Sequence, residues 1–260
     1  MLRKRLLYVI PVLLIILGIG LYYWQPWQAK QQTVDLNNAG EIVKACQRAS
    51  GELKNFRYKT DISVGKQITV TVNNRVIREQ PKRQMADFSW EIPKMSGAAT
   101  MYTEGQRVYI LHPLKGKWVL PNEEPTINPY MDFFWGQLGL VDPVENILKL
   151  DPLGKNISPY LEGTDEGSDS VAIQVIPDAK ALSEINKSLP PQFAAGELTD
   201  AKQYFWISKK DFLVTRYEIR ASVAFFGIKT MNFLTVSTPA DYDKTKITVP
   251  KGLQEKMKQK

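Results

Sequence analysis

The chain has 260 residues, a formal net charge of +7, one cysteine and one histidine. A single cysteine excludes an intramolecular disulfide, so the folded part must be stabilised by its core. The excess positive charge lies mostly in Arg3, Lys4, Arg5 and the C-terminal lysines, which leaves the body nearly neutral and without the basic stripe of a nucleic-acid-binding domain.

The N-terminal segment has the pattern of a membrane anchor. Residues 6–23 contain no charged side chain and are about as long as a helix needs to cross a bilayer core. The basic residues that precede them are typical of a cytoplasmic flank, and Tyr22, Tyr23, Trp24 and Trp27 are typical of a lipid–water boundary. We therefore predict a cytoplasmic tail (1–5), a transmembrane signal-anchor (6–24) and a tether (25–35).

A cleaved signal peptide is the alternative interpretation of this segment. Gly18-Ile19-Gly20 could serve as a cleavage site, but the apolar run is long and large aromatic residues follow it. The anchor predicts a single-pass protein of the plasma membrane in a bacterial cell envelope, with a cytoplasmic N-terminus and an extracytoplasmic C-terminal domain.

The domain is predicted to begin with one helix and then change to strands. Asn37 or Asn38 can cap a helix whose apolar residues recur at helical spacing, with Cys46 buried among them and Gly51 at its end. From Phe56 the apolar residues alternate with polar ones, which is typical of half-buried antiparallel strands. The predicted strands of this half are 56–64, 68–77, 85–92, two strands that turn at Glu104-Gly105, and a short one at 116–120.

The middle of the chain is predicted to be helical and the last third to be strands. Two short helical segments are separated by Asp142-Pro143, where Asp142 can cap the second and Pro143 can begin it. The first of them, Tyr130 to Leu140, is apolar almost all round, so we expect it to be buried or to contact something apolar. An acidic turn, a strand at 171–176, a third helical segment (178–189), a hairpin turning at Lys209–Asp211 and a last long strand complete about ten strands and four helices.

The sequence offers no recognisable catalytic or metal-binding motif. His112 is the only histidine, so zinc sites and cysteine–histidine dyads cannot be built, and we expect it to be a turn or surface residue. No G-x-S-x-G motif is present, and the acidic cluster of Asp165, Glu166 and Asp169 lacks the spacing of a calcium loop. We therefore predict a protein that is not an enzyme and has no cofactor.

The order of these elements resembles the lipoprotein-carrier superfamily, in its LolA/LolB-like and LppX/LprG-like forms, together with related anchored proteins. The phrases that carry the resemblance are "ASGELKNFRYKTDISV", "GQRVYILHPLKGKWVL", "DPVENILKL" and "YFWISKKDFLVTRYEIRASV". The resemblance implies an α+β fold in which helices cover the concave mouth of a strongly curved antiparallel sheet, an incomplete β-barrel. Residues 36–250 would form this domain and residues 251–260 a basic flexible tail.

The resemblance also implies a hydrophobic ligand, such as a lipid or the acyl chain of a lipoprotein, between sheet and helices. This chain lacks the N-terminal cysteine of lipid-modified relatives, so a protein anchor would replace the lipid anchor. The large apolar residues predicted to line the cavity and its lid are Phe88, Trp90, Tyr102, Trp118, Phe133, Phe134, Trp135, Leu138, Tyr204 and Trp206. The alternatives are that these aromatics form an ordinary core, and that the domain is a membrane-anchored sensor or assembly factor that docks a protein partner of the envelope.

Overall fold

The computed structural model describes residues 34–65, 68–92, 95–113, 115–123, 142–160, 168–180, 182–183, 196–225 and 229–258. The chain divides into two compact units, Met1–Val34 and Asp35–Lys260. Only the second unit is treated below.

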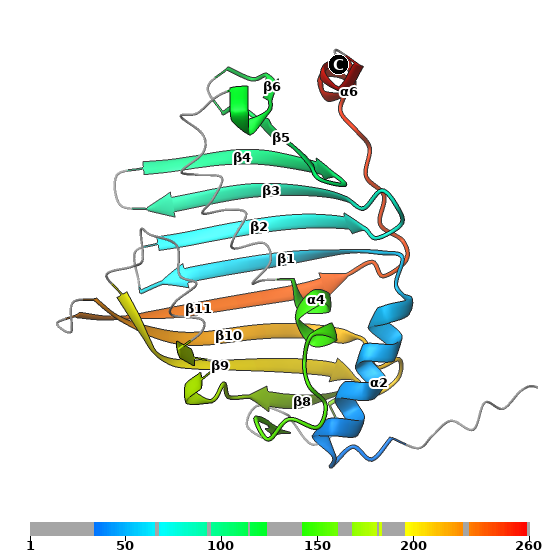
Figure 1. Ribbon diagram of the computed structural model, residues 1–260, viewed down its shortest axis with the longest axis vertical. Helices are drawn as coiled ribbons and strands as arrows, with labels where there is room; N and C mark the ends of the chain where they lie inside the picture. The colour runs from blue at the N-terminus through cyan, green and yellow to red at the C-terminus, as the bar shows by residue number, and fades with distance from the viewer. Residues whose placement is uncertain are drawn as a thin grey trace, which may run out of the picture. The chain divides into compact units, whose positions relative to one another are not determined.

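The second unit is built on one open antiparallel sheet of eleven strands in the order β6-β5-β4-β3-β2-β1-β11-β10-β9-β8-β7 (Figure 1). The first half of the chain forms the meander β1 to β6 and the second half the meander β7 to β11, and the two halves join where β1 pairs with β11. The predicted antiparallel sheet is confirmed, with the strands β1 (Asn55–Val64), β2 (Ile68–Ile77), β3 (Arg83–Ile92), β4 (Met95–Glu104), β5 (Arg107–Leu111), β6 (Trp118–Val119), β7 (Ile157–Pro159), β8 (Ser170–Val175), β9 (Gly196–Ser208), β10 (Val214–Phe225) and β11 (Lys229–Ala240).

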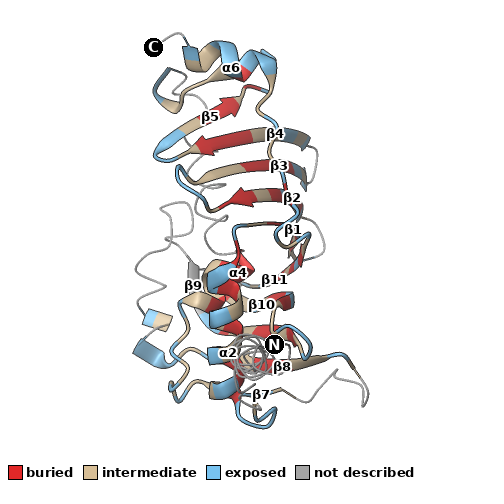
Figure 2. Cartoon of the chain, turned by 90° about the vertical axis from the view of Figure 1, so that its right-hand side faces the viewer, coloured by how far each residue is buried: buried red, intermediate tan, exposed pale blue. Residues whose placement is uncertain are grey.

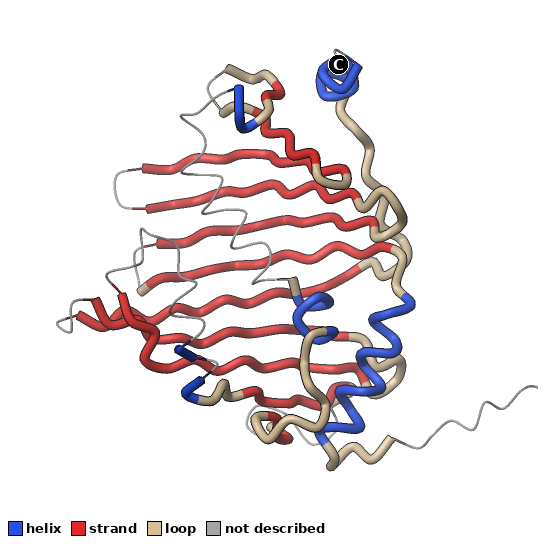
Figure 3. Tube along the Cα trace, in the orientation of Figure 1, coloured by secondary structure: helices blue, strands red, loops and turns tan. Residues whose placement is uncertain are grey.

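The described helices include α2 (Ala39–Glu52), the 3-10 turn η1 (Pro121–Glu123), α4 (Pro143–Leu148) and α6 (Lys251–Lys258). The helices α2, α4 and α6 lie toward one end of the strands, and the 3-10 turn η1 lies beside β5 (Figure 1). Figure 3 shows α2 and α4 crossing the same ends of the strands. They hold each other through Gln47 of α2, whose amide donates to the carbonyl oxygens of Ile147 at 3.0 Å and Leu150 at 2.7 Å.

The face of the sheet that carries α2 and α4 is called the inner face here. It is defined by Phe56 and Tyr58 of β1, which pack in one buried cluster with Val144 of α4. Strand alternation places every second residue of the neighbouring strands on the same face, including Val72 and Phe88. The outer face is the opposite one, which carries Met85 and Tyr102.

The first helix begins where the sequence predicts and ends elsewhere. The side chain of Asn38 accepts from the backbone N–H of Gly40 at 3.0 Å and of Glu41 at 3.3 Å, so the predicted N-cap is confirmed. Gly51 does not end the helix, because α2 continues to Glu52 and Leu53 is the C-cap in an extended conformation. Leu53 is buried in the inner-face cluster, so packing of this side chain and entry into β1 set the helix end.

The start of α4 is also as predicted. Asp142 is the N-cap, with its carboxylate accepting from the N–H groups of Val144 and Glu145 at 3.0 Å each, and Pro143 is the first helical residue. Cys46 of α2 is fully buried, as expected, and burial raises the pKa of its thiol to about 12.

The expected flexible tail is instead an ordered helix over most of its length. In α6 the side chain of Leu253 is fully buried against Met85, Tyr102 and Tyr109 on the outer face, with Met257 packed beside them. The prediction of a flexible tail is therefore wrong for Lys251–Lys258, because Leu253 and Met257, which are at helical spacing, pack on an apolar cluster of the outer face. Figure 2 shows the buried position within α6.

Several predicted segments lie outside the described residues. These are the anchor (6–24), the apolar segment Tyr130 to Leu140, most of the acidic turn and most of the third helical segment. In the part of the chain that the structure describes, no helix has both the length and the apolar character needed to cross a membrane.

Candidate functional site

The inner face over β1 to β4 is mostly apolar. Val72 of β2 lies opposite Phe88 of β3, and Val70 lies opposite Trp90. The indole of Trp90 lies over Gly97 of β4, where a Cβ atom would collide with the ring. The glycine therefore makes room for the largest side chain on this face.

The described helices contact both halves of the inner face. Val144 of α4 packs in the buried cluster with Phe56 and Tyr58 of β1. In the half of the sheet that comes from the second meander, α4 contacts β10 and α2 contacts β7. There Phe205 of β9 and Tyr217 of β10 are fully buried, with ring centroids 4.5 Å apart. This half is an ordinary helix-covered core.

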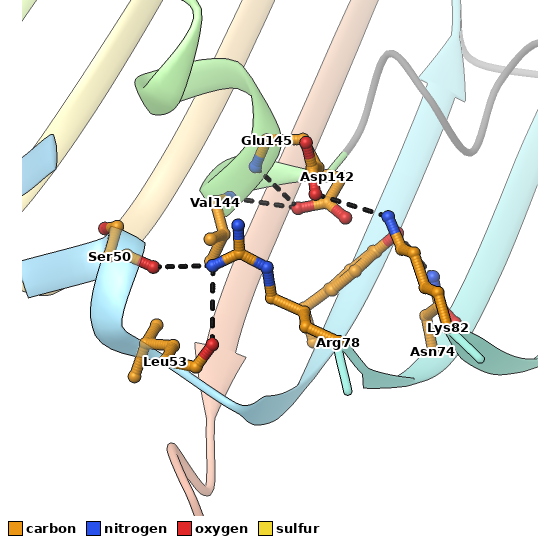
Figure 4. Close-up of polar contacts among 9 residues, drawn as sticks. Ser50, Leu53, Asn74, Arg78, Lys82, Asp142, Val144 and Glu145 are labelled. Carbon is orange, nitrogen blue, oxygen red and sulfur yellow. Dashed lines mark hydrogen bonds and ion pairs between the residues drawn. The ribbon is translucent and has the colours of Figure 1, made fainter. Parts of the chain in front are cut away.

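A group of charged and polar side chains lies where the two halves meet, at the first turn of α4 (Figure 4). Arg78 donates to the carbonyl oxygens of Ser50 at 2.8 Å and Leu53 at 3.4 Å. Lys82 forms an ion pair of 3.2 Å with Glu145. Both side-chain cations are thus already bonded to groups of the protein itself.

Asp142 is the buried acid of this group. Its side chain is almost completely buried, and burial raises its pKa to about 6, a rise that the adjacent Glu145 supports and Lys82 and the two capping N–H groups oppose. The carboxylate has no ion pair with a cation among the described residues. The site is therefore poor in positive charge that a ligand could use.

Two further polar side chains of the inner face lie on β1 and β2. Asn74 lies directly opposite Tyr58, and its amide nitrogen donates to the Tyr58 hydroxyl at 2.5 Å. The pKa of Tyr58 is well above its ordinary value because the ring is buried and because Asp142 and Glu145 are close. The Oδ1 atom of Asn74 is buried and has no hydrogen-bond partner among the described residues.

Of the ten predicted ligand residues, the structure places Phe88 and Trp90 together on the inner face. Tyr102 and Trp118 lie instead in the outer-face cluster with Leu253 of α6. The physical reason is strand alternation: Tyr102 pairs with Met85, one residue out of phase with Ala86 and Phe88. Phe133, Phe134, Trp135 and Leu138 lie outside the described residues.

Tyr204 and Trp206 also lie on the outer face, not with Phe88. The guanidinium of Arg216 lies 5.1 Å from the ring centroid of Trp206, and that of Arg220 lies 4.8 Å from the ring centroid of Tyr204. Both arginines bond the buried carboxylate of Glu218, at 2.7 Å and 2.5 Å. Four of the predicted residues are therefore not brought to the predicted cavity.

The inward-facing core residue of β9 that the sequence analysis did not single out is Phe205. The segment "YFWI" of β9 is apolar at every position, so alternation within the strand could not choose a face. The neighbouring strand could have done so, because Arg216, Glu218 and Arg220 alternate with Tyr217 and Ile219, and Tyr217 pairs with Phe205.

His112, the single histidine of the sequence, is a buried residue of a turn. His112 is 7% exposed and stabilises a turn, where its Nδ1 accepts from the N–H of Lys115 at 3.3 Å. Among the described residues no group of three or more His, Cys, Asp or Glu side chains is placed to hold a metal ion.

Comparison with known proteins finds similarity only at the level of structure. No family model matches the chain, and no curated protein matches it in sequence. LprF from Mycobacterium bovis matches over 82% of this chain and 96% of its own, with 14% identity and a TM-score of 0.46. A LolA superfamily protein from Nitrosomonas europaea matches over 82% of this chain and 95% of its own, with 9% identity and a TM-score of 0.26.

Proposed function

We propose that this protein is a non-catalytic, membrane-anchored carrier or binding protein for a hydrophobic ligand, a lipid or the acyl chain of a lipoprotein. The observation that carries the proposal is the apolar inner face of β1 to β3, where Ile62, Val72 and Phe88 are buried in one cluster. An open sheet of this kind must have its inward side chains covered, either by the chain itself or by a ligand.

The proposed location is the outer side of the plasma membrane, with residues 6–24 as an uncleaved anchor. The expected result is a mature protein whose mass includes Met1 or begins directly after it. Intact-mass measurement of protein extracted from membranes tests this. An N-terminus near Leu21 would instead identify the segment as a signal peptide.

Trp90 and Trp206 form a matched pair for testing where the ligand binds. Both are partly buried strand residues, but Trp90 lies on the inner face and Trp206 on the outer face. We expect Trp90→Ala to weaken the binding of a fluorescent fatty-acyl probe about tenfold, because losing part of an indole contact costs roughly 1.4 kcal/mol. We expect Trp206→Ala to change the affinity less than twofold.

Equal losses in the two variants, or no loss in either, would argue against the inner face as the binding surface. The denaturation midpoints of both variants serve as controls for a general loss of stability. Native mass spectrometry of gently extracted wild-type protein should in addition show an excess mass of lipid size.

A protein-docking role, the alternative, calls for an exposed apolar patch on the outer face. Leu234 of β11 is 40% exposed there, next to Arg220. One large exposed hydrophobic side chain beside a charged residue does not favour docking, so we do not propose this role.

A further inference from the structure

An unpartnered polar atom interrupts the apolar row that β2 presents to the inner face. Ile68, Val70, Val72 and Val76 share this face with Asn74, which is 1% exposed. Asn74 donates to Tyr58, but its Oδ1 atom has no hydrogen-bond partner among the described residues. A buried carbonyl oxygen without a donor costs free energy, and a side chain such as leucine would fill the position without this cost. The unpartnered Oδ1 atom of Asn74 is therefore suited to accept a hydrogen bond from a ligand.

Asn74 and Tyr58 can make two further hydrogen bonds, one as an acceptor and one as a donor. The free Oδ1 of Asn74 is an acceptor. The hydroxyl of Tyr58 accepts from Asn74 and keeps its own proton to donate. A hydroxyl group matches this arrangement because it both donates and accepts.

The surrounding charges disfavour an anionic ligand group. Lys82 is paired with Glu145, and Arg78 is bonded to two backbone carbonyl oxygens. Asp142 adds a buried carboxyl group at the first turn of α4, in the neighbourhood that Figure 4 draws around Asn74 and Lys82. A carboxylate or phosphate would therefore enter a site without a free cation among the described residues.

A row of buried apolar side chains leads away from this polar pair along the inner face. Val72, the next inward residue of β2, lies opposite Phe88, and Val70 lies opposite Trp90. An acyl chain attached to a group at Asn74 could follow this row of side chains away from α4.

We propose that Asn74 and Tyr58 form a polar subsite for the hydroxyl group of an uncharged acylglycerol, whose acyl chain lies along Val72, Phe88 and Trp90. The proposal rests on the proposed function and adds the class of ligand to it. Selectivity follows from chemistry: a glycerol hydroxyl satisfies both polar atoms, an ester without a hydroxyl satisfies at most one, and a carboxylate cannot donate to Asn74.

The test uses the full chain in detergent at pH 8 and three competitors with the same oleoyl chain: monooleoylglycerol, oleate and methyl oleate. Each competitor displaces a fluorescent acyl probe. We expect monooleoylglycerol to compete about tenfold better than the other two on the wild type. Asn74→Leu should reduce this preference to less than threefold while the affinity for methyl oleate stays unchanged.

The matched control is Asn73→Leu, the same substitution at the adjacent, exposed residue on the outer face of β2. It should keep the full preference. Because Asn74→Leu leaves the Tyr58 hydroxyl without its donor, the double variant Tyr58→Phe/Asn74→Leu is measured as well. It leaves no polar atom of the pair, and we expect it to fold and to show the same loss of preference.

The outcomes separate this inference from the proposed function. If the wild type binds the acyl probe but does not prefer monooleoylglycerol, the subsite is disproved and the hydrophobic-ligand function stands. The subsite is equally disproved if Asn73→Leu lowers the preference as much as Asn74→Leu does. If the wild type does not bind the acyl probe at all, both proposals fall.

Discussion

Asp142→Asn is expected to raise the free energy of unfolding at pH 7.5 by up to about 3 kcal/mol. Asparagine caps a helix about as well as aspartate, so the bonds to the N–H groups of Val144 and Glu145 can be kept. What the substitution removes is the cost of a buried negative charge, which is expressed in the rise of the Asp142 pKa to about 6. The gain is an upper limit, because it assumes that asparagine fits the buried position as well as the protonated aspartic acid does; the pKa of about 6 already includes the opposing effect of Lys82.

The pH dependence of the stability tests the role of the Asp142 carboxyl group more specifically than the stability at one pH does. The pKa of Asp142 is higher in the folded state than in the unfolded chain, so between about pH 4 and pH 6 the folded protein holds a proton that the unfolded protein has released. The contribution of this group therefore stabilises the fold at low pH and is lost as the pH rises through the folded pKa. The titratable groups that face Asp142 are Lys82, Glu145, Tyr58, Tyr217 and Tyr242, of which the three tyrosines stay neutral in this range.

Urea unfolding at pH 4.5 and pH 7.5 measures the effect in the wild type, in Asp142→Asn and in a control, Asp151→Asn. Asp151 is an exposed aspartate in the loop after α4 and also accepts a backbone N–H, from Leu153 at 2.9 Å. The difference between wild type and Asp142→Asn should be small at pH 4.5 and largest at pH 7.5. A variant that is less stable than the wild type at pH 7.5 would show that the charged cap contributes more than its burial costs.

The strands could be predicted from the sequence because one of their faces is buried and the other is not. In β1 and β2 this difference is strict, and the alternation of residues such as Phe56, Tyr58 and Val72 gives both the strand and its inner face. Strand β7 has only three residues and no period to detect, so it was missed. Helix starts were recoverable from Asn38 and Asp142, because capping is local chemistry.

Features that depend on packing against residues far away in the sequence could not be predicted from local sequence signals. Gly51 looks like a helix end, yet burial of Leu53 carries α2 one residue beyond it. The lysine-rich sequence of α6 looks like a solvated tail, and only the outer-face patch of Met85, Tyr102 and Tyr109 gives Leu253 a place to pack. Tertiary contacts override local signals in both cases.

The candidate site depended on the choice of face, which single residues do not reveal. Phe88 and Trp90 share the inner face, as the alternation of their strand with polar residues predicts, and their contact with a ligand stays a prediction. Alternation did not give the face of Tyr204 and Trp206, because β9 is apolar on both faces and the arginines of β10 stack on its outer aromatics. Asn74 gave no signal as a site, since an amide in an apolar row becomes informative only when its missing partner is known.

The two glycines of α2 offer a last test, because the same substitution should have opposite effects at its two ends. A Cβ atom at Gly51 would meet nothing within 4 Å, whereas one at Gly40 would collide with the backbone carbonyl oxygen of Pro152 in the loop after α4. Gly51→Ala should therefore stabilise the protein by about 0.5–1 kcal/mol through helix propensity.

Gly40→Ala should destabilise it by about 1–3 kcal/mol, because the clash is with backbone and not with a side chain that could turn away. The loop is held by its own turn, in which the N–H of Gly154 donates to the carbonyl oxygen of Asp151 at 3.0 Å. A shift of Pro152 would therefore also disturb the contact between α2 and α4 that Gln47 bridges. The denaturant midpoints of the two variants, compared with that of the wild type, measure both changes in stability. If Gly40→Ala is also stabilising, the loop yields at no cost, and the close approach of α2 to the residues after α4 does not contribute to the stability of the fold.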